Sequence, residues 1–130
     1  MATILVAEDN DDLRYIIRDI LIGSGHTVIE ACDGSEVSDL LDKNTVDLLI
    51  TDIVMPEQEG IQTIVFVHRQ FPAVRIIAMS GGGSLGGADY YLDMAKSFGA
   101  DAILEKPFAM AKLKQIVAAI LTLEVVDGAP

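Results

Sequence analysis

Short apolar runs alternate along this chain with longer segments in which apolar residues recur at helical spacing. Five runs rich in Val, Ile and Leu are typical of strands buried on both faces, because a strand with one face in water would alternate polar and apolar residues. These runs are Thr3–Ala7, Thr27–Ala31, Leu48–Thr51, Arg75–Met79 and Ala102–Leu104. The second run is the least uniformly apolar, which predicts a strand at the edge of the sheet.

A segment with helical character follows each predicted strand. Four of these segments carry apolar stripes, at Leu13–Leu21, Val37–Leu41, Ile61–His68 and Ile116–Leu121, and another helix is expected over roughly 89–98. We expect Asp11 or Asp12 to cap the first helix and Ser35 to open the second. Strands that alternate with helices predict an α/β fold, with a doubly wound parallel sheet of five strands covered by helices on both faces.

The composition narrows the class of protein. The chain has 130 residues, of which 51% are hydrophobic, so one domain with a real core is expected. We place this domain at residues 1–123 and a short C-terminal tail at residues 124–130. Nine basic residues against twenty acidic ones give a net charge of −11. This charge opposes binding to nucleic acid or to anionic membranes, and it favours cations or basic partner surfaces.

The sequence carries no sign of export or membrane insertion. The N-terminus lacks a basic stretch, and no apolar run approaches the ~20 residues that span a bilayer, so we expect a cytoplasmic protein. The single cysteine, Cys32, lies in an apolar, strand-like run and is expected to be a packed and inert thiol.

Polar residues stand at the ends of four predicted strands. The first strand is followed by Glu8 and Asp9, the third by Asp52, the fourth by Ser80, and the fifth by Glu105 and Lys106. The carboxyl ends of parallel strands meet at one edge of the sheet, where α/β proteins bind ligands. Clustered carboxylates repel each other unless a cation is present, and Mg²⁺ suits oxygen ligands and a phosphate. Lys106 and the Ser80 hydroxyl are suited to phosphoryl oxygens, and one carboxylate is suited to become an acyl phosphate.

Taken singly, these residues also have ordinary structural explanations. An acidic residue after the first strand can cap the following helix, and an aspartate or serine at a strand end can form a turn. A lone lysine such as Lys106 is most often a solvated charge. Their joint placement at four strand ends is what favours a phosphoryl-binding pocket.

These residues resemble the receiver domains of two-component response regulators. The resemblance extends from Thr3 to about Leu123. It rests on the pair Glu8-Asp9, the stretch Asp52-Ile53-Val54-Met55-Pro56 with Gly60, Ser80 followed by Gly81, and Lys106-Pro107-Phe108. The family implies a flavodoxin-like receiver fold, with five helices around a five-stranded sheet in the order 2-1-3-4-5.

The resemblance also implies an acceptor and a metal site. Asp52 would be the phosphoacceptor, and a histidine kinase or histidine phosphotransfer protein would supply the phosphoryl group. Mg²⁺, or Mn²⁺ in its place, would be held by Asp9, Asp52 and the backbone carbonyl of Val54. Glu8 stands where an aspartate is commoner, and its longer side chain would still reach the metal through water.

The family assigns the remaining pocket residues to phosphate binding. Ser80 and Lys106 would bind the phosphoryl oxygens, and the Lys106-Pro107 peptide would be cis. Family members usually carry an aromatic ring three residues before this lysine, and the ring swings inward on activation. Here that position is Ile103. We therefore expect the signal to travel through the loop after Ser80 instead.

The segment 81–87 and the residues after it are candidates for the switch and partner surface. Gly81 and Gly82 begin a glycine-rich stretch that lacks the Gly-Lys-Ser/Thr ending of a nucleotide-binding loop. We expect a connector that tightens when Ser80 engages phosphate. Tyr90 and Tyr91 open the fourth helix, where one of them either faces a partner or is partly exposed without a role. Ile103 and Pro107 are assigned to the same surface.

The expected function is a phosphorylation switch that catalyses only its own phosphorylation and dephosphorylation. It would bind a downstream protein target, as a monomer or a phosphorylation-dependent dimer, and would be a stand-alone receiver or a piece of a longer regulator. One alternative is a Mg²⁺-dependent phosphatase with an aspartyl-phosphate intermediate, although Val54 stands where such an enzyme needs a general acid. Another is a degenerate receiver that binds partners without being phosphorylated.

Overall fold

The computed structural model of the chain describes residues 1–53, 59–81 and 96–122, with side chains at all of these positions except 59, 60 and 81. Its five strands form one sheet in the order β2-β1-β3-β4-β5, and every neighbouring pair is parallel. The strands are β1 (Thr3–Ala7), β2 (Thr27–Ala31), β3 (Leu48–Asp52), β4 (Arg75–Gly81) and β5 (Ala102–Lys106). The predicted fold class, the strand order and the edge position of β2 are therefore confirmed.

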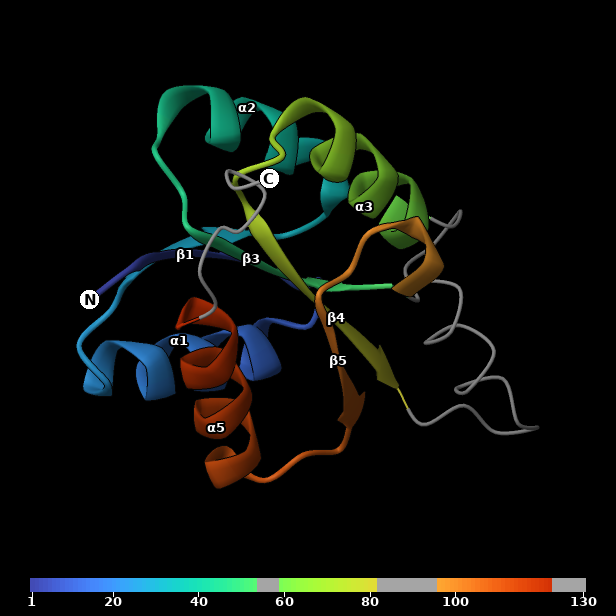
Figure 1. The fold of residues 1–130 in the computed structure, drawn as a ribbon. Coiled ribbons are helices and arrows are strands. Elements are labelled where there is room, and N and C mark those ends of the chain that lie inside the picture. Colours follow the sequence, from blue (N-terminus) through green and yellow to red (C-terminus); the bar gives the residue numbers. More distant parts are fainter. Residues whose placement is uncertain (54–58, 82–95, 123–130) are drawn as a thin grey trace.

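Helices cover both faces of this sheet. They are α1 (Asp11–Gly23), the short 3₁₀ helix η1 (Gly34–Glu36), α2 (Val37–Lys43), α3 (Glu59–Gln70) and α5 (Met110–Leu121). Figure 1 shows α1 and α5 on one face and α2 and α3 on the other. Most of the predicted fourth helix lies outside the described residues, and residues 96–98 are helical.

The core consists of two apolar layers separated by the sheet. One layer joins β-strand side chains to α2 and α3, through residues such as Leu49 and Ile64. The other joins the opposite strand faces to α1 and α5, through residues such as Ile50 and Ile17. All five residues of β3 are buried, and each large apolar side chain fully removed from water stabilises the fold by about 1.5–3 kcal/mol. The neighbouring inner strands β1 and β3 are thus firmly held, and their carboxyl ends lie side by side.

Three strands extend further than their apolar runs predicted. Asp52 pairs with Met79 in the β3–β4 ladder, and Lys106 pairs with Gly81 in the β4–β5 ladder. The polar residues Asp52, Ser80 and Lys106 are therefore the last or near-last residues of strands, and do not follow them. Backbone pairing continues past the apolar residues because the ladder depends on main-chain groups, whereas the prediction used side chains only.

The helix starts also differ from the prediction. Asn10 caps α1, because its side-chain oxygen accepts a hydrogen bond from the amide of Leu13 at 2.9 Å, while the predicted caps Asp11 and Asp12 lie inside the helix. Ser35 lies within η1, and α2 begins at Val37 without a side-chain cap. The sequence has several possible capping residues in a row. Only the path of the folded chain decides which of them has the extended backbone that an N-cap requires.

One further expectation about burial was wrong. Cys32 is exposed, because β2 ends one residue before it. In α3 the buried face runs through Ile64 and Val67, and His68 is exposed. The predicted tail at residues 124–130 lies outside the described residues. Within the described parts of the chain, we find no helix with the length and apolar character needed to cross a membrane.

Candidate functional site

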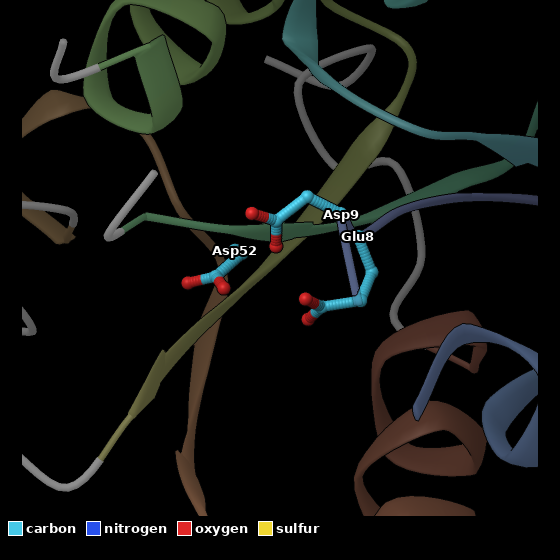
Figure 2. Close-up of side chains that lie close together, drawn as sticks. All are labelled: Glu8, Asp9 and Asp52. Carbon is cyan, nitrogen blue, oxygen red and sulfur yellow. The ribbon is translucent and has the colours of Figure 1, made fainter. Parts of the chain in front are cut away.

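The sheet register brings the sequence-predicted pocket residues to one edge. Ala7, which precedes Glu8, pairs with Thr51, which precedes Asp52. The carboxyl end of β5 reaches the same edge, where Lys106 is its last residue. Figure 2 shows the Glu8 and Asp9 side chains leaving the end of β1 next to Asp52 at the end of β3.

Three carboxylates form a compact cluster at this edge. One oxygen each from Glu8, Asp9 and Asp52 lies within 4.8 Å of the others (Figure 2). Glu8 is 1% exposed and Asp52 is 5% exposed, whereas Asp9 is open to solvent. Two buried carboxylates next to a third one repel each other, so this edge of the sheet requires positive charge.

Lys106 supplies one positive charge from within the protein. Its Nζ donates to Glu8 Oε1 at 2.8 Å and to Asp52 Oδ2 at 2.9 Å. Burial raises the pKa of Glu8, and the hydrogen bond from Lys106 opposes this rise without cancelling it. Burial lowers the pKa of the Lys106 ammonium, but its hydrogen bonds to Glu8 and Asp52 outweigh burial and leave the pKa raised. Lys106 is therefore firmly charged at neutral pH.

Two residues that the sequence did not single out hold Glu8, one through its side chain and the other through its main chain. The backbone N–H of Asn10 donates to Glu8 Oε2 at 3.1 Å, and Arg14 Nη1 donates to the Glu8 carbonyl oxygen at 2.8 Å. The sequence held a signal for Arg14, because it stands three residues before Ile17 on the buried stripe of α1. An arginine on an apolar stripe indicates a buried partner nearby.

Ser80 contributes a buried hydroxyl to the end of β4. The residue is 0% exposed, and its Oγ has no hydrogen-bond partner among the residues that the structure describes. Ser80 follows Met79, which pairs with Asp52, so the hydroxyl belongs to the strand adjacent to the acidic cluster. Burying a hydroxyl without a partner costs free energy, because the group loses its hydrogen bonds to water and gains none in the protein. Such a hydroxyl is typical of a ligand-binding site.

Replacing Ser80 by Ala should leave the free energy of unfolding unchanged or raise it by up to about 1 kcal/mol, because the hydroxyl that it removes is buried and has no partner among the described residues. Thr51→Val is the matched comparison, since the buried Thr51 hydroxyl donates to the Asp52 carbonyl oxygen at 3.3 Å. That variant should lose stability. Urea unfolding of both variants measures the change in the free energy of unfolding. A clear loss of stability in Ser80→Ala would contradict the interpretation that its hydroxyl has no partner in the fold.

The predicted switch and partner residues are only partly covered by the structure. Ile103 is half-buried and packs against the core layer of α2 and α3, and Pro107 is exposed. The Lys106-Pro107 peptide is cis, as expected. The backbone of Gly81 ends β4. The predicted roles of Val54, Gly82, Tyr90 and Tyr91 fall outside the described residues.

Comparison with known protein families matches residues 4–118 to the family described as the response regulator receiver domain. Among curated proteins, the transcriptional regulatory protein CpxR of Escherichia coli K12 is 36% identical over 123 residues. The match covers 93% of this chain and 50% of CpxR, so the chain spans about half the length of that relative.

Solved structures show the same fold. A putative response regulator from Chloroflexus aurantiacus is 26% identical, with a TM-score of 0.83 over 94% of this chain and 98% of that chain. The receiver domain of NtrX from Brucella abortus is 24% identical, with a TM-score of 0.85 over 93% of this chain and 99% of that one. The second likeness supports the fold alone.

Proposed function

Because this chain belongs to the response regulator receiver family of two-component systems, we propose that Asp52 accepts a phosphoryl group and thereby changes what the domain binds. The observation that carries this proposal is the contact of Lys106 with both Glu8 and Asp52 inside a three-carboxylate cluster. This arrangement combines a nucleophile with fixed positive charge, and phosphoryl transfer depends mainly on positioning and charge neutralisation.

The donor set fits Mg²⁺. The cluster offers carboxylate oxygens only, and one lysine does not neutralise three carboxylates. We propose that Asp9 and Asp52 hold the ion, together with the Val54 carbonyl, and that Glu8 acts through water. When bound, Mg²⁺ would neutralise charge on the transferring phosphoryl group, and Mn²⁺ is suited to the same ligands.

In the proposed step, an oxygen of Asp52 forms a bond to phosphorus as the bond between phosphorus and the donor breaks. The bonding electrons leave with the donor, which is the imidazole nitrogen of a phosphohistidine or the carboxylate of a small acyl phosphate. The product is an acyl phosphate on Asp52. Lys106 and the Ser80 hydroxyl are the groups of this chain that would bind the phosphoryl oxygens. Water attack on phosphorus would later return free Asp52 and inorganic phosphate.

The physiological donor in this proposal is a histidine kinase or a histidine phosphotransfer protein. Phosphorylation would act on a downstream target, or on a second copy of the chain, through the surface that includes Ile103, Pro107 and the segment after Ser80. The net charge of −11 suits a basic partner patch better than a nucleic acid. CpxR is described as a transcriptional regulatory protein, and half of its length lies outside the match to this chain.

The direct test uses acetyl phosphate as donor and intact mass as the readout. We expect the wild-type protein to gain the mass of one phosphoryl group in the presence of Mg²⁺ and to lose this gain when EDTA is added. Hydrolysis of a small phosphate ester, with phosphate released in large excess over protein, would favour a phosphatase. A protein that forms no adduct with Mg²⁺ present would be a degenerate receiver, and the proposal would be wrong.

A further inference from the structure

Arg14 is a buried cation that the proposed chemistry does not use. It lies in the first turns of α1, and the residue is 4% exposed. Among the described residues it is the only buried arginine or lysine. Burying a guanidinium is costly unless its donors are satisfied, so its contacts must account for its position.

Two of these contacts neutralise the charge of Arg14. Its Nη2 lies 2.7 Å from Asp11 Oδ1, and its Nε lies 3.0 Å from Glu30 Oε1 on β2. Glu30 also meets Arg18 at 3.3 Å. Burial lowers the pKa of Arg14, but the hydrogen bonds to Asp11 and Glu30 outweigh it, so the pKa is raised and the guanidinium stays charged. Buried ion pairs of this kind are weak evidence for stability, because apolar side chains often serve as well.

The third contact is with the main chain of the metal pocket. The β1–β2 ladder ends where Ala7 pairs with Ala31, and the Glu8 amide still donates to the Ala31 carbonyl at 3.1 Å. The Glu8 carbonyl receives Arg14 Nη1 at 2.8 Å. Both backbone groups of Glu8 are therefore held. Since a peptide unit is planar, fixing the Glu8 carbonyl also fixes the direction in which Asp9 begins.

We propose that Arg14 is a positioning residue for the metal pocket, which holds the Glu8–Asp9 peptide so that both carboxylates face Asp52. This inference rests on the Mg²⁺ site proposed above. Groups that orient metal ligands from behind commonly change metal affinity by 10–100-fold when they are removed. Arg14 suits this task because its planar fork of donors reaches Asp11, Glu30 and the Glu8 carbonyl at the same time.

The test measures Mg²⁺ binding by titration calorimetry, without any phosphodonor, in wild type, Arg14→Met, Arg14→Lys and Glu30→Gln. Arg14→Met should weaken Mg²⁺ binding by about tenfold or more. Arg14→Lys keeps the charge but carries its donors on a single nitrogen, and it should recover part of the affinity. Glu30→Gln breaks an ion pair of Arg14 but leaves the bond to Glu8, so it should lower the melting temperature without changing Mg²⁺ affinity.

A second readout needs no metal. The backbone N–H of Asn10 donates to Glu8 Oε2 at 3.1 Å, so the hydrogen exchange of this backbone amide reports whether Glu8 is held in place. Exchange of this amide should accelerate in Arg14→Met and not in Glu30→Gln. If Arg14→Met does not fold, Arg14→Lys carries the same comparison with a smaller effect.

The outcomes separate the two proposals. Wild-type Mg²⁺ affinity in a folded Arg14→Met variant, or an equal loss in Glu30→Gln, would overturn the positioning role and leave the proposed function standing. Failure of the wild type to bind Mg²⁺ would overturn the metal site and the role of Arg14 in its affinity. Accelerated Asn10 exchange in Arg14→Met alone, together with the affinity loss, would support the inference.

Discussion

Asp52→Asn should abolish the phosphoryl adduct that acetyl phosphate and Mg²⁺ produce on the wild type. An amide oxygen is far less nucleophilic than a carboxylate, so the variant lacks the group that attacks phosphorus. Asn has the size of Asp and retains an oxygen that can accept from Lys106, whose Nζ lies 2.9 Å from Asp52 Oδ2. The fold should therefore survive, and the loss of the adduct should reflect chemistry.

The matched control is Asp42→Asn. Asp42 is an exposed aspartate of α2, on an element that contributes nothing to the carboxylate cluster. Its variant should form the adduct at the wild-type rate. Intact mass and peptide mapping of all three proteins decide the matter. An undiminished adduct on Asp52→Asn, or a wild-type adduct that maps to another residue, would contradict the assignment of Asp52 as the acceptor.

Lys106→Met should destabilise the metal-free protein more than any other single change in the pocket. The variant leaves the Glu8 and Asp52 carboxylates buried without their cation, and removing one partner of a buried ion pair costs about 3–5 kcal/mol. Because the Lys106 side chain is 17% exposed, we expect a loss near the lower end, about 3 kcal/mol at neutral pH. Met preserves the apolar stem, so the loss reports the charge.

This loss should depend on pH with a definite sign. Burial already raises the pKa of Glu8, and without the opposing Lys106 the pKa would rise further. A carboxyl with a raised pKa binds more protons in the folded state than in the unfolded state, so stability falls as pH increases through that pKa. The deficit of Lys106→Met should therefore be largest at neutral pH and shrink on acidification, as Glu8 becomes protonated.

Denaturant unfolding in EDTA at several pH values measures this deficit, with Lys114→Met as control. Lys114 is an exposed lysine of α5, and its variant should stay within about 0.5 kcal/mol of wild type. Mg²⁺ should restore more stability to Lys106→Met than to wild type, because the ion replaces the missing charge. A deficit that is independent of both pH and Mg²⁺ would show that Lys106 acts through packing.

The sequence predicted some features of the fold correctly and did not predict others. The five strands and the edge position of β2 were predicted correctly, because runs of Val, Ile and Leu mark buried strands wherever they occur. The strand order was predicted correctly from the resemblance to receiver domains and not from the apolar pattern. The exposure of Cys32 and the cap at Asn10 were not predicted. Both depend on where the chain turns after a strand, and hydrophobic patterns carry little information about turns.

The sequence by itself determined which residues gather at the carboxyl edge of the sheet, because a parallel sheet brings strand ends together whatever the details of packing. It did not determine how they pair. Only the tertiary structure placed Lys106 between Glu8 and Asp52, across separations of 98 and 54 residues, and left the Ser80 hydroxyl without a partner among the described residues. The same holds for Arg14 on the Glu8 carbonyl. Contacts between distant residues depend on side-chain reach and burial, and these exist only once the layers of the fold have packed.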